Sequence, residues 1–440
     1  MNTATRRDFL KTAAAGGLAL TVFPSSVRAV SANDKLNTAH IGVGGMGRSD
    51  LRSLTSHSHV NVTAMCDIDG NRLAAASKDF PDAKLFSDFR ELFEQTSDRI
   101  DAVVVSTPDH THAPAAMTAL NLGKHVYCQK PLTHDVYEAR RLNEVAAEKG
   151  LVTQMGIQGH AGVAYRSAVQ VIQSGAIGRV SEVHAWSFKN WGYDGGLKAD
   201  ADVVPSHLKW DLWLGTAAKR PYKKGVYHPG NWRKRVDFGT GTLGDMGVHI
   251  FDTPYRALQL TAPQNVRTTC RPSTGIGHPE KNVVEYTFPG TRHTTDTLRW
   301  VWYDGAWAPP ADHGFPIPEG AKLPDQGSIF IGEKGAFLLP HGGEWQLLPA
   351  DEFADYERPE LEPLDHYHQF VDACLGKTKT SAHFGYGGPL TEALLLGVVA
   401  NRFPDTTLEW DAAGMKVTNL SEANQLLRRS YRQGFEVAGL

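Results

Sequence analysis

The sequence predicts a doubly wound, parallel α/β domain followed by a larger α+β domain whose sheet is open and mostly antiparallel. Three observations lead to this fold class. Apolar, β-branched runs alternate with helical patterns over residues 36–155, and a glycine-rich turn joins the first of these strands to the first helix. Short strands separated by Gly and Pro turns then dominate residues 156–440, and helical patterns follow late in the chain at 390–401 and 422–434. We therefore expect the first domain at 36–155 and the second at 156–440.

The glycine-rich turn has the spacing G-x-G-x-x-G. In such a turn the first glycine permits the tight bend, the second lets the backbone approach a pyrophosphate, and the third lets the helix pack on the strand. The phosphates then lie at the positive end of the following helix. The residues expected to bind a dinucleotide here are Gly42, Gly44, Gly45, Met46 and Gly47.

An acidic residue lies where a dinucleotide site of the Rossmann type needs one. The second strand, 60–65, leads into Asp67, which follows Gly47 by twenty residues. An acid at this spacing binds the ribose hydroxyls and repels a 2′-phosphate, so the expected cofactor is NAD. Arg72 is close enough in sequence to Asp67 that NADP stays an alternative cofactor. The alternative interpretation is a glycine turn and a helix-capping Asp with no nucleotide.

The composition excludes several classes. The chain has 440 residues, 41% of them hydrophobic and 21% charged, which is typical of a globular protein with two or three domains. A formal net charge of −3 gives no general electrostatic case for nucleic acid, and four cysteines do not form a disulfide framework. His366 with His368, and Asp109 with His110 and His112, lack further ligands at compatible spacing, so we assign no metal.

Residues 1–32 predict a twin-arginine signal peptide. Arg6 and Arg7 precede an Ala/Gly-rich apolar run at 12–23, and small-residue cleavage patterns follow at 27–32. The apolar run is too short to span a bilayer, and no other stretch is long enough. The expected location is therefore the periplasm or another exported compartment.

Polar residues follow two predicted strands of the first domain. Thr107 and Pro108 come after the buried run 102–106, at the carboxyl edge of the sheet where ligands bind in open α/β folds. His112 opens the next helix, as a site residue or as an ordinary surface histidine. Gln129 and Lys130 come after strand 125–128. An ammonium there can orient a carbinol, stabilise alkoxide character or relay a proton.

The second domain contributes a second polar group. On an α-helix over 244–252, Asp245, His249 and Asp252 would share one face. His249 suits general acid/base catalysis near neutral pH, Asp245 would position it or bind a hydroxyl, and Asp252 would support the helix or pack behind His249. The alternative is a capping Asp and a core His.

Aromatic residues with polar residues between them fill 186–233, a composition that suits stacking on sugar rings and equally suits an irregular core. Trp232 and Arg233, close in sequence to Asp245, are the expected pocket members. Gln158 and His160 follow the last strand of the first domain. They either line the cleft expected between the two domains or serve only as hinge residues.

Taken together and in this order, the glycine turn, residues 107–112, residues 129–131 and residues 244–252 resemble the glucose–fructose oxidoreductase / inositol dehydrogenase (Gfo/Idh/MocA) family over about residues 36–410. The resemblance implies NAD(P)-dependent oxidation or reduction of a sugar or cyclitol carbon, with Lys130 between substrate and nicotinamide and a cis Pro131. The family usually has Glu where this chain has Gln129, and the effect of that departure stays open.

The resulting hypothesis is an exported NAD(P)-dependent oxidoreductase of sugars, glycosides or cyclitols. Free dinucleotide is scarce outside the cytoplasm, so the cofactor would be loaded before export and recycled in place. One alternative is an NAD-dependent glycosidase that works by transient oxidation and elimination. Those enzymes resemble this chain but lack the Lys of the motif, which favours the oxidoreductase. The other alternative is a sugar- or cofactor-binding protein without turnover. We expect a homo-oligomer.

Overall fold

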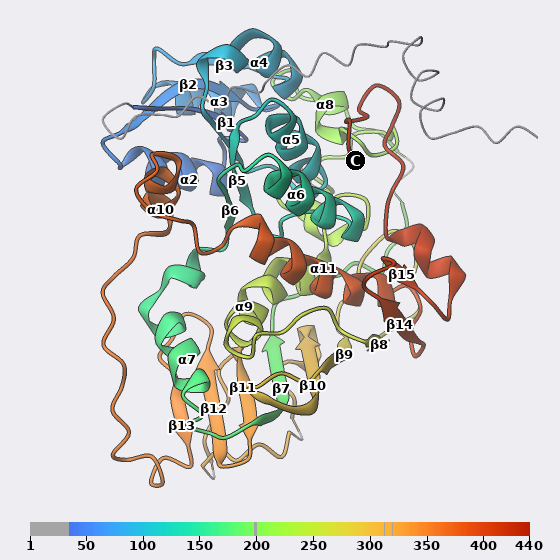
Figure 1. Ribbon diagram of the computed structural model, residues 1–440. Helices are drawn as coiled ribbons and strands as arrows, with labels where there is room; N and C mark the ends of the chain where they lie inside the picture. Colours follow the sequence, from blue (N-terminus) through green and yellow to red (C-terminus); the bar gives the residue numbers. More distant parts are fainter. Residues whose placement is uncertain (1–34, 198–199, 312, 319) are drawn as a thin grey trace, which may run out of the picture.

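The computed structural model describes residues 35–197, 200–311, 313–318 and 320–440, so the predicted signal peptide lies outside the described residues. Figure 1 shows two sheets at opposite ends of the molecule, with α9 (Val248–Ala257) and α11 (Phe384–Ala400) between them. Within the described ranges no helix is both long and apolar enough to cross a membrane.

The first sheet has six parallel strands in the order β3-β2-β1-β4-β5-β6, which confirms the predicted doubly wound domain. Its central strands are buried on both faces, as their continuous apolar sequences require. The strands are β1 (Leu36–Ile41), β2 (Val60–Cys66), β3 (Lys84–Phe86), β4 (Ala102–Val105), β5 (His125–Gln129) and β6 (Thr153–Gly156).

Five α-helices and the 3₁₀ turn η1 (Ser97–Arg99) connect these strands, and side chains at the N-termini explain where several of the α-helices begin. The Asp69 and Asp88 side chains accept from backbone N–H groups of the helices that follow them, and Asp135 forms a capping box with Glu138. The helices are α2 (Met46–Thr55), α3 (Gly70–Ser77), α4 (Phe89–Thr96), α5 (Asp109–Asn121) and α6 (Val136–Glu148).

The second sheet has nine strands in the order β13-β12-β11-β7-β10-β9-β8-β14-β15. Its pairs are antiparallel except for β7 with β10, which confirms an open, mostly antiparallel sheet. The strands are β7 (Val180–Ser187), β8 (Asn265–Thr269), β9 (Val283–Pro289), β10 (Thr294–Asp304), β11 (Gln326–Gly332), β12 (Gly335–Pro340), β13 (Gln346–Leu348), β14 (Thr407–Asp411) and β15 (Lys416–Val417).

Residues 158–247 also contain short helical segments that lie between the sheets or beside the first one. They are η2 (Gln158–Ala161), α7 (Val163–Gln173), α8 (Trp210–Leu214), η3 (Asn231–Lys234) and the π-helical turn η4 (Leu243–Gly247). α7 packs against α9, and η4 leads directly into α9.

The later part of the chain returns to the first domain. α10 (His366–Cys374) packs against α2, and Phe370 and Val371 join the buried cluster around Tyr127 of β5. α11 packs along α6. The helix expected at 422–434 is wrong: a 3₁₀ turn, η6 (Ser421–Leu426), is followed by irregular chain that runs from β15 back to α5 and α8 (Figure 1).

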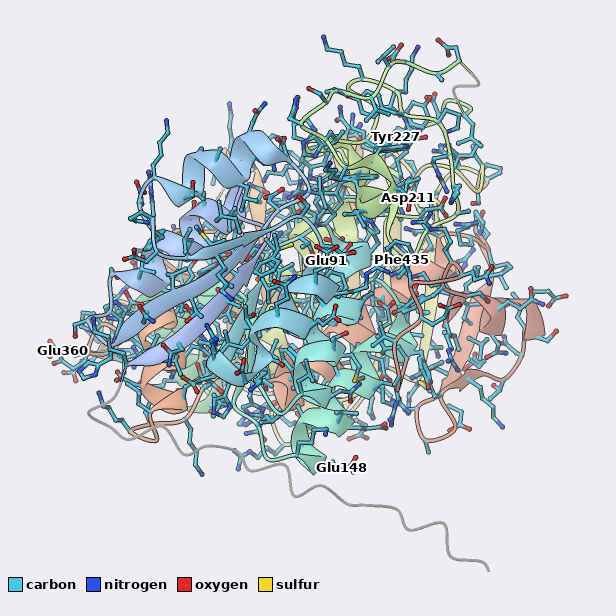
Figure 2. The ribbon with its side chains drawn as sticks, turned by 90° about the horizontal axis from the view of Figure 1, so that it is seen from above. Glu91, Glu148, Asp211, Tyr227, Glu360 and Phe435 are labelled. Carbon is cyan, nitrogen blue, oxygen red and sulfur yellow. The ribbon has the colours of Figure 1, made fainter. Side chains whose placement is uncertain are left out.

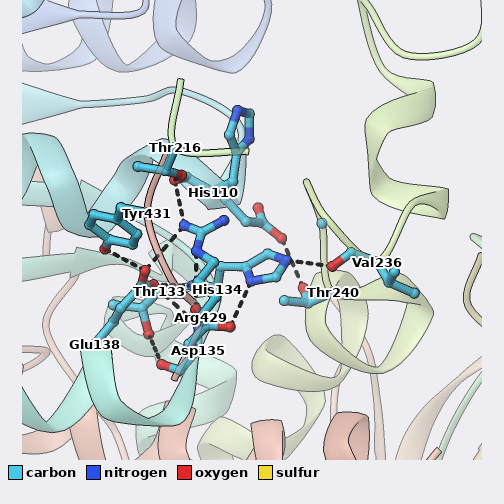
Figure 3. Close-up of polar contacts among 12 residues, drawn as sticks. His110, Thr133, His134, Asp135, Glu138, Thr216, Val236, Thr240, Arg429 and Tyr431 are labelled. Atoms are coloured by element: carbon cyan, nitrogen blue, oxygen red, sulfur yellow. Dashed lines mark hydrogen bonds and ion pairs between the residues drawn. The ribbon is translucent and has the colours of Figure 1, made fainter. Parts of the chain in front are cut away.

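Arg429 anchors this returning segment to the start of α6 (Figure 3). Its guanidinium lies 3.1 Å from both the Asp135 and the Glu138 carboxylates, and it donates to the His110 carbonyl at 2.7 Å. The Tyr431 hydroxyl donates to Glu138 at 2.6 Å. The Glu138 side chain is 2% exposed and that of Asp135 is 9% exposed. Both carboxylates therefore depend on Arg429 for charge compensation, together with His134 beside Asp135.

We predict that Arg429→Leu lowers the free energy of unfolding by about 3–5 kcal/mol, because it leaves buried carboxylates without their cation. The matched control is Arg428→Ala, at an exposed neighbour that lies over the Tyr137 ring, which should cost no more than about 1 kcal/mol. Urea unfolding of the three proteins measures both values. Equal stability of the two variants would contradict the anchoring role.

Candidate active site

A cavity of about 700 Å³ follows the carboxyl edge of the first sheet. That volume lies within the range of small-molecule and cofactor sites. Most residues predicted to bind a dinucleotide line it, and Trp232 and Arg233 of η3 lie at its wall toward the second domain. The predicted cofactor residues among its lining are Gly42, Gly44, Gly45, Met46, Asp67, Thr107 and Pro108.

The glycine turn has the geometry of a pyrophosphate cradle. Gly42 has φ +85°, and a Cβ there would lie 2.5 Å from the Ser106 carbonyl oxygen. A Cβ on Gly47 would lie 2.0 Å from the carbonyl oxygen of Gly42, so α2 can approach β1 only without a side chain at this position. The residues present therefore fit a dinucleotide whose phosphates face the N-terminus of α2.

Asp67 lies at the end of β2, at the cavity wall. Its carboxylate accepts from the backbone N–H of Val43 at 2.9 Å and of Asp69 at 2.9 Å, which joins the glycine turn to the next strand. Burial raises the pKa of Asp67 and the two backbone N–H bonds oppose that effect. The Arg72 side chain lies across Gly44, where a Cβ would be 2.2 Å from Arg72 Cδ, so the cation expected near the ribose also borders the phosphate cradle.

His112 connects two of the predicted site turns instead of lying on the surface. It is 1% exposed, and its ring nitrogens lie 2.8 Å from the carbonyl oxygens of Pro131 and Thr107. The Lys130–Pro131 peptide bond is cis, as the family resemblance implies. His112 thus holds the turn after β4 against the turn after β5, which sets where Thr107 and Lys130 lie relative to each other.

Gln129 is buried in a network that the sequence reading did not include. Its side-chain amide donates to both carboxylate oxygens of Asp50, in α2, at 3.0 Å. Asp50 also accepts from the hydroxyls of Ser106 at 2.6 Å and Tyr367 at 3.0 Å, and Gln158 donates to Tyr367 at 3.1 Å. Burial raises the pKa of Asp50 and these donors oppose the shift. A Glu in place of Gln129 would put two buried carboxylates face to face.

Lys130 and Asp245 meet across the two domains. Lys130 Nζ donates to Oδ1 and to the backbone carbonyl of Asp245, both at 2.9 Å. Arg233 Nε donates to the same Oδ1 at 3.0 Å, and Trp191 Nε1 donates to Oδ2 at 2.7 Å. Burial alone raises the pKa of Asp245, but Lys130 and Arg233 outweigh it and hold the pKa below its usual value. Asp245 is therefore ionised at neutral pH and holds two cations.

His249 lies in α9, four residues after Asp245 of η4. It is bonded neither to Asp245 nor to Lys130 in this structure. Its ring lies 5.6 Å from the ring of His341, which follows β12. Burial lowers the pKa of His249 well below its usual value, and the charge of Lys130 lowers it further. His249 is thus neutral at neutral pH, as a hydrogen-bonding group or a proton acceptor.

Asp252 points away from this group. Its carboxylate lies 2.8 Å from His160 Nδ1 and accepts from the Tyr386 hydroxyl at 2.6 Å. Residues 243–247 form the π-helical turn η4 and the α-helix begins only at Val248, so Asp245 does not have the expected α-helical spacing to His249 and Asp252. His160 is 2% exposed and Gln158 bonds Tyr367, so neither lines the cavity.

Sequence reasoning left out Asp50, Lys189 and His341. Asp50 follows the glycine turn by one helical turn, and only the fold shows that it faces Gln129. Lys189 Nζ lies 3.3 Å from Met246 Sδ, and His341 comes from a strand end more than ninety residues after His249. No local motif marks the last two, because they reach the site through the second sheet.

Residues 36–157 match the oxidoreductase family described as an NAD-binding Rossmann fold, and residues 162–271 match the C-terminal alpha/beta domain of that family. The inositol 2-dehydrogenase 2 of Saccharopolyspora erythraea is 33% identical over 229 residues, which are 49% of this chain and 67% of that relative. The chain belongs to the Gfo/Idh/MocA family. Its first domain is the family's NAD-binding Rossmann domain.

Other relatives and solved structures match different shares of the chain. The inositol 2-dehydrogenase of Salmonella typhimurium is 31% identical over 152 residues, 34% of this chain and 45% of that enzyme, so this chain spans about half the length of such relatives. The crystal structure of GenD2 from gentamicin A biosynthesis, in complex with NAD, covers 88% of this chain and 99% of its own with a TM-score of 0.60 at 20% identity. That likeness shows a shared fold.

We predict that Gln129→Glu lowers the free energy of unfolding by at least about 2 kcal/mol, because it places a second buried carboxylate against Asp50. The double variant Gln129→Glu/Asp50→Asn reverses donor and acceptor and should recover most of that loss. Chemical denaturation of the two single variants and the double variant measures the coupling. Simple addition of the two single losses would show that the residues do not act as a pair.

Proposed function

We propose that this protein is an NAD(P)-dependent oxidoreductase that acts on a carbon of a sugar, glycoside or cyclitol. The observation that carries the proposal is the cluster of Lys130, Asp245 and Arg233, which joins the end of β5 to the second domain beside the dinucleotide cavity. Relatives of the family include proteins named inositol 2-dehydrogenase and levoglucosan dehydrogenase, which supports a polyhydroxylated substrate.

The bound nicotinamide would supply the acceptor or donor of a hydride. The glycine turn and Asp67 would hold its dinucleotide. Two of the three Lys130 ammonium protons are used on Asp245, so the third can donate to a substrate oxygen. Neutral His249 can accept the hydroxyl proton that leaves with oxidation of a carbinol. Asp245 holds the Lys130 side chain in place.

Asp67 favours NAD over NADP in this proposal. A carboxylate near the ribose hydroxyls accepts hydrogen bonds from them and repels a 2′-phosphate. Arg72 is the residue that supports NADP as the alternative, since its side chain lies beside the same part of the cavity.

We further propose that the protein is exported with its cofactor already bound and recycles it there. The twin-arginine pattern at Arg6 and Arg7 supports export, and the large lining of the cavity, which includes residues 435–438, supports retention. Recycling requires either a second sugar as the oxidant or a redox-neutral reaction. The second option is the glycosidase alternative, in which transient oxidation, elimination and re-reduction consume no net cofactor.

One experiment separates these functions. The purified, denatured protein is analysed by mass spectrometry for a released dinucleotide, and the native protein is then incubated with a panel of sugars and glycosides. Net oxidation with an external acceptor supports the oxidoreductase. Glycoside cleavage without net redox change supports the glycosidase, and binding without either product supports a non-catalytic protein.

We predict that Lys130→Met and His249→Asn each lower the single-turnover rate of hydride transfer by about two to four orders of magnitude while cofactor stays bound. The reason is that each removes one side of the proton transfer. If the two residues act as a unit, the double variant loses little beyond the slower single one. Multiplication of the two losses would mean independent roles, and full activity of His249→Asn would remove that residue from the chemistry.

We predict that replacing Arg6 and Arg7 with Lys retains the protein in the cytoplasm with its first residues uncleaved, because the export pathway reads the paired arginines. Fractionation of cells followed by immunoblotting measures the distribution, with Lys11→Arg as a control that leaves the pair intact. Normal export of the Lys–Lys variant would contradict a twin-arginine signal.

A further inference from the structure

One end of the dinucleotide cavity is closed by residues from the far end of the sequence. The cavity is lined here by residues 435–438 together with residues from the start of α4 and from one side of α5. This is the end beyond Asp67, where the ribose and adenine of a dinucleotide lie when its pyrophosphate occupies the glycine turn. Figure 2 labels Phe435 in the region of Glu91 of α4 and Asp211 of α8.

Two arginines hold the Phe435 ring. The guanidinium carbons of Arg90 and Arg432 lie 4.3 Å and 4.2 Å from its centroid. Arg90 is itself held by Asp88, with Nε 3.0 Å from both carboxylate oxygens, and it donates to the Gly434 carbonyl at 2.6 Å. The ring therefore rests on the wall of the cavity that belongs to the first domain.

The same segment is also bonded to the wall formed by α8 and the residues after it. Arg432 donates to the Asp211 carboxylate at 2.6 Å and to the Gly215 carbonyl at 2.9 Å, and its backbone N–H donates to the Thr216 carbonyl at 2.9 Å. α8 and the residues after it line the cavity on this side. The segment 432–435 thus connects both walls across the cavity.

Beyond Phe435 the chain is fastened again. Asn121 donates to the Ala438 carbonyl at 2.8 Å, and Arg141 donates to the Gly439 carbonyl at 3.2 Å. Together with the Arg429 anchor before it, these contacts fix the segment on both sides of the point where it crosses the cavity.

We propose that residues 432–439 form a strap that completes the adenosine-binding subsite and retains the dinucleotide. Phe435 and Val437 supply an apolar wall for the adenine ring, and departure of the dinucleotide requires the strap to detach from α4 and α5. Such a detachment is a local unfolding event, so release is slow relative to an open groove. This inference rests on the proposed function only in taking the cavity as the dinucleotide site.

The test measures binding and release, with no turnover. The full-length protein is loaded with NADH, mixed with excess NAD, and the loss of bound NADH fluorescence is followed. Phe435→Ala should release NADH at least tenfold faster than the parent protein and should bind AMP at least tenfold more weakly. Gln433→Ala, at an exposed position of the same segment outside the cavity lining, is the matched control and should behave as the parent does.

A second measurement needs no variant. Backbone hydrogen exchange of residues 434–439 in the parent protein should slow when NADH or AMP is added and stay unchanged with nicotinamide mononucleotide, which lacks the adenosine part. Equal release rates for the parent and Phe435→Ala, or exchange at 434–439 that ignores AMP, would overturn the strap while leaving the proposed function intact. Absence of any NADH binding by the parent protein would overturn both.

Discussion

The bond between Lys130 and Asp245 is the interaction on which the site depends. Lys130 comes from the end of a parallel strand and Asp245 from a π-helical turn in the other domain, so their contact sets how the two domains meet. Asp245 also accepts from Arg233 of the 3₁₀ turn η3 and from Trp191 on irregular chain. One ionised carboxylate therefore holds side chains from three separate segments of the chain in place. A buried charge of this kind is tolerated only because each oxygen has a donor.

Much of the fold could be predicted from the sequence because its signals are local. The first domain has continuous apolar strands, capped helices and a glycine turn whose third glycine has no room for a side chain. β3 was missed, because it is only three residues long and two of them are exposed. The helix expected at 422–434 was wrong because Arg429 and Tyr431 bond the first domain and Arg432 bonds Asp211 of α8, and those contacts override the local helical pattern.

The site was predictable only as far as motifs extend. The glycine turn, Asp67, Thr107 and Pro108 line the cavity together, and Lys130 meets Asp245. The chemistry of Gln129 could not be read from its own motif, because its partner Asp50 is seventy-nine residues away. His160 and Asp252 each suggested a site role, yet they bond each other inside the second domain. A short motif identifies a residue type and a spacing, whereas partners brought together by the sheets depend on tertiary packing.

The return of the late chain to the first domain has a consequence for folding during synthesis. Domains usually fold as units as they leave the ribosome, with the N-terminal one first. Here α10 covers the face of α2, α11 packs on α6, and the cavity that begins at the glycine turn is completed by residues 435–438. The nascent first domain therefore lacks part of its core and one wall of its cavity until nearly all of the described chain has been made. Completion of the nucleotide site is therefore a late step in folding, and it takes place only when both domains are present.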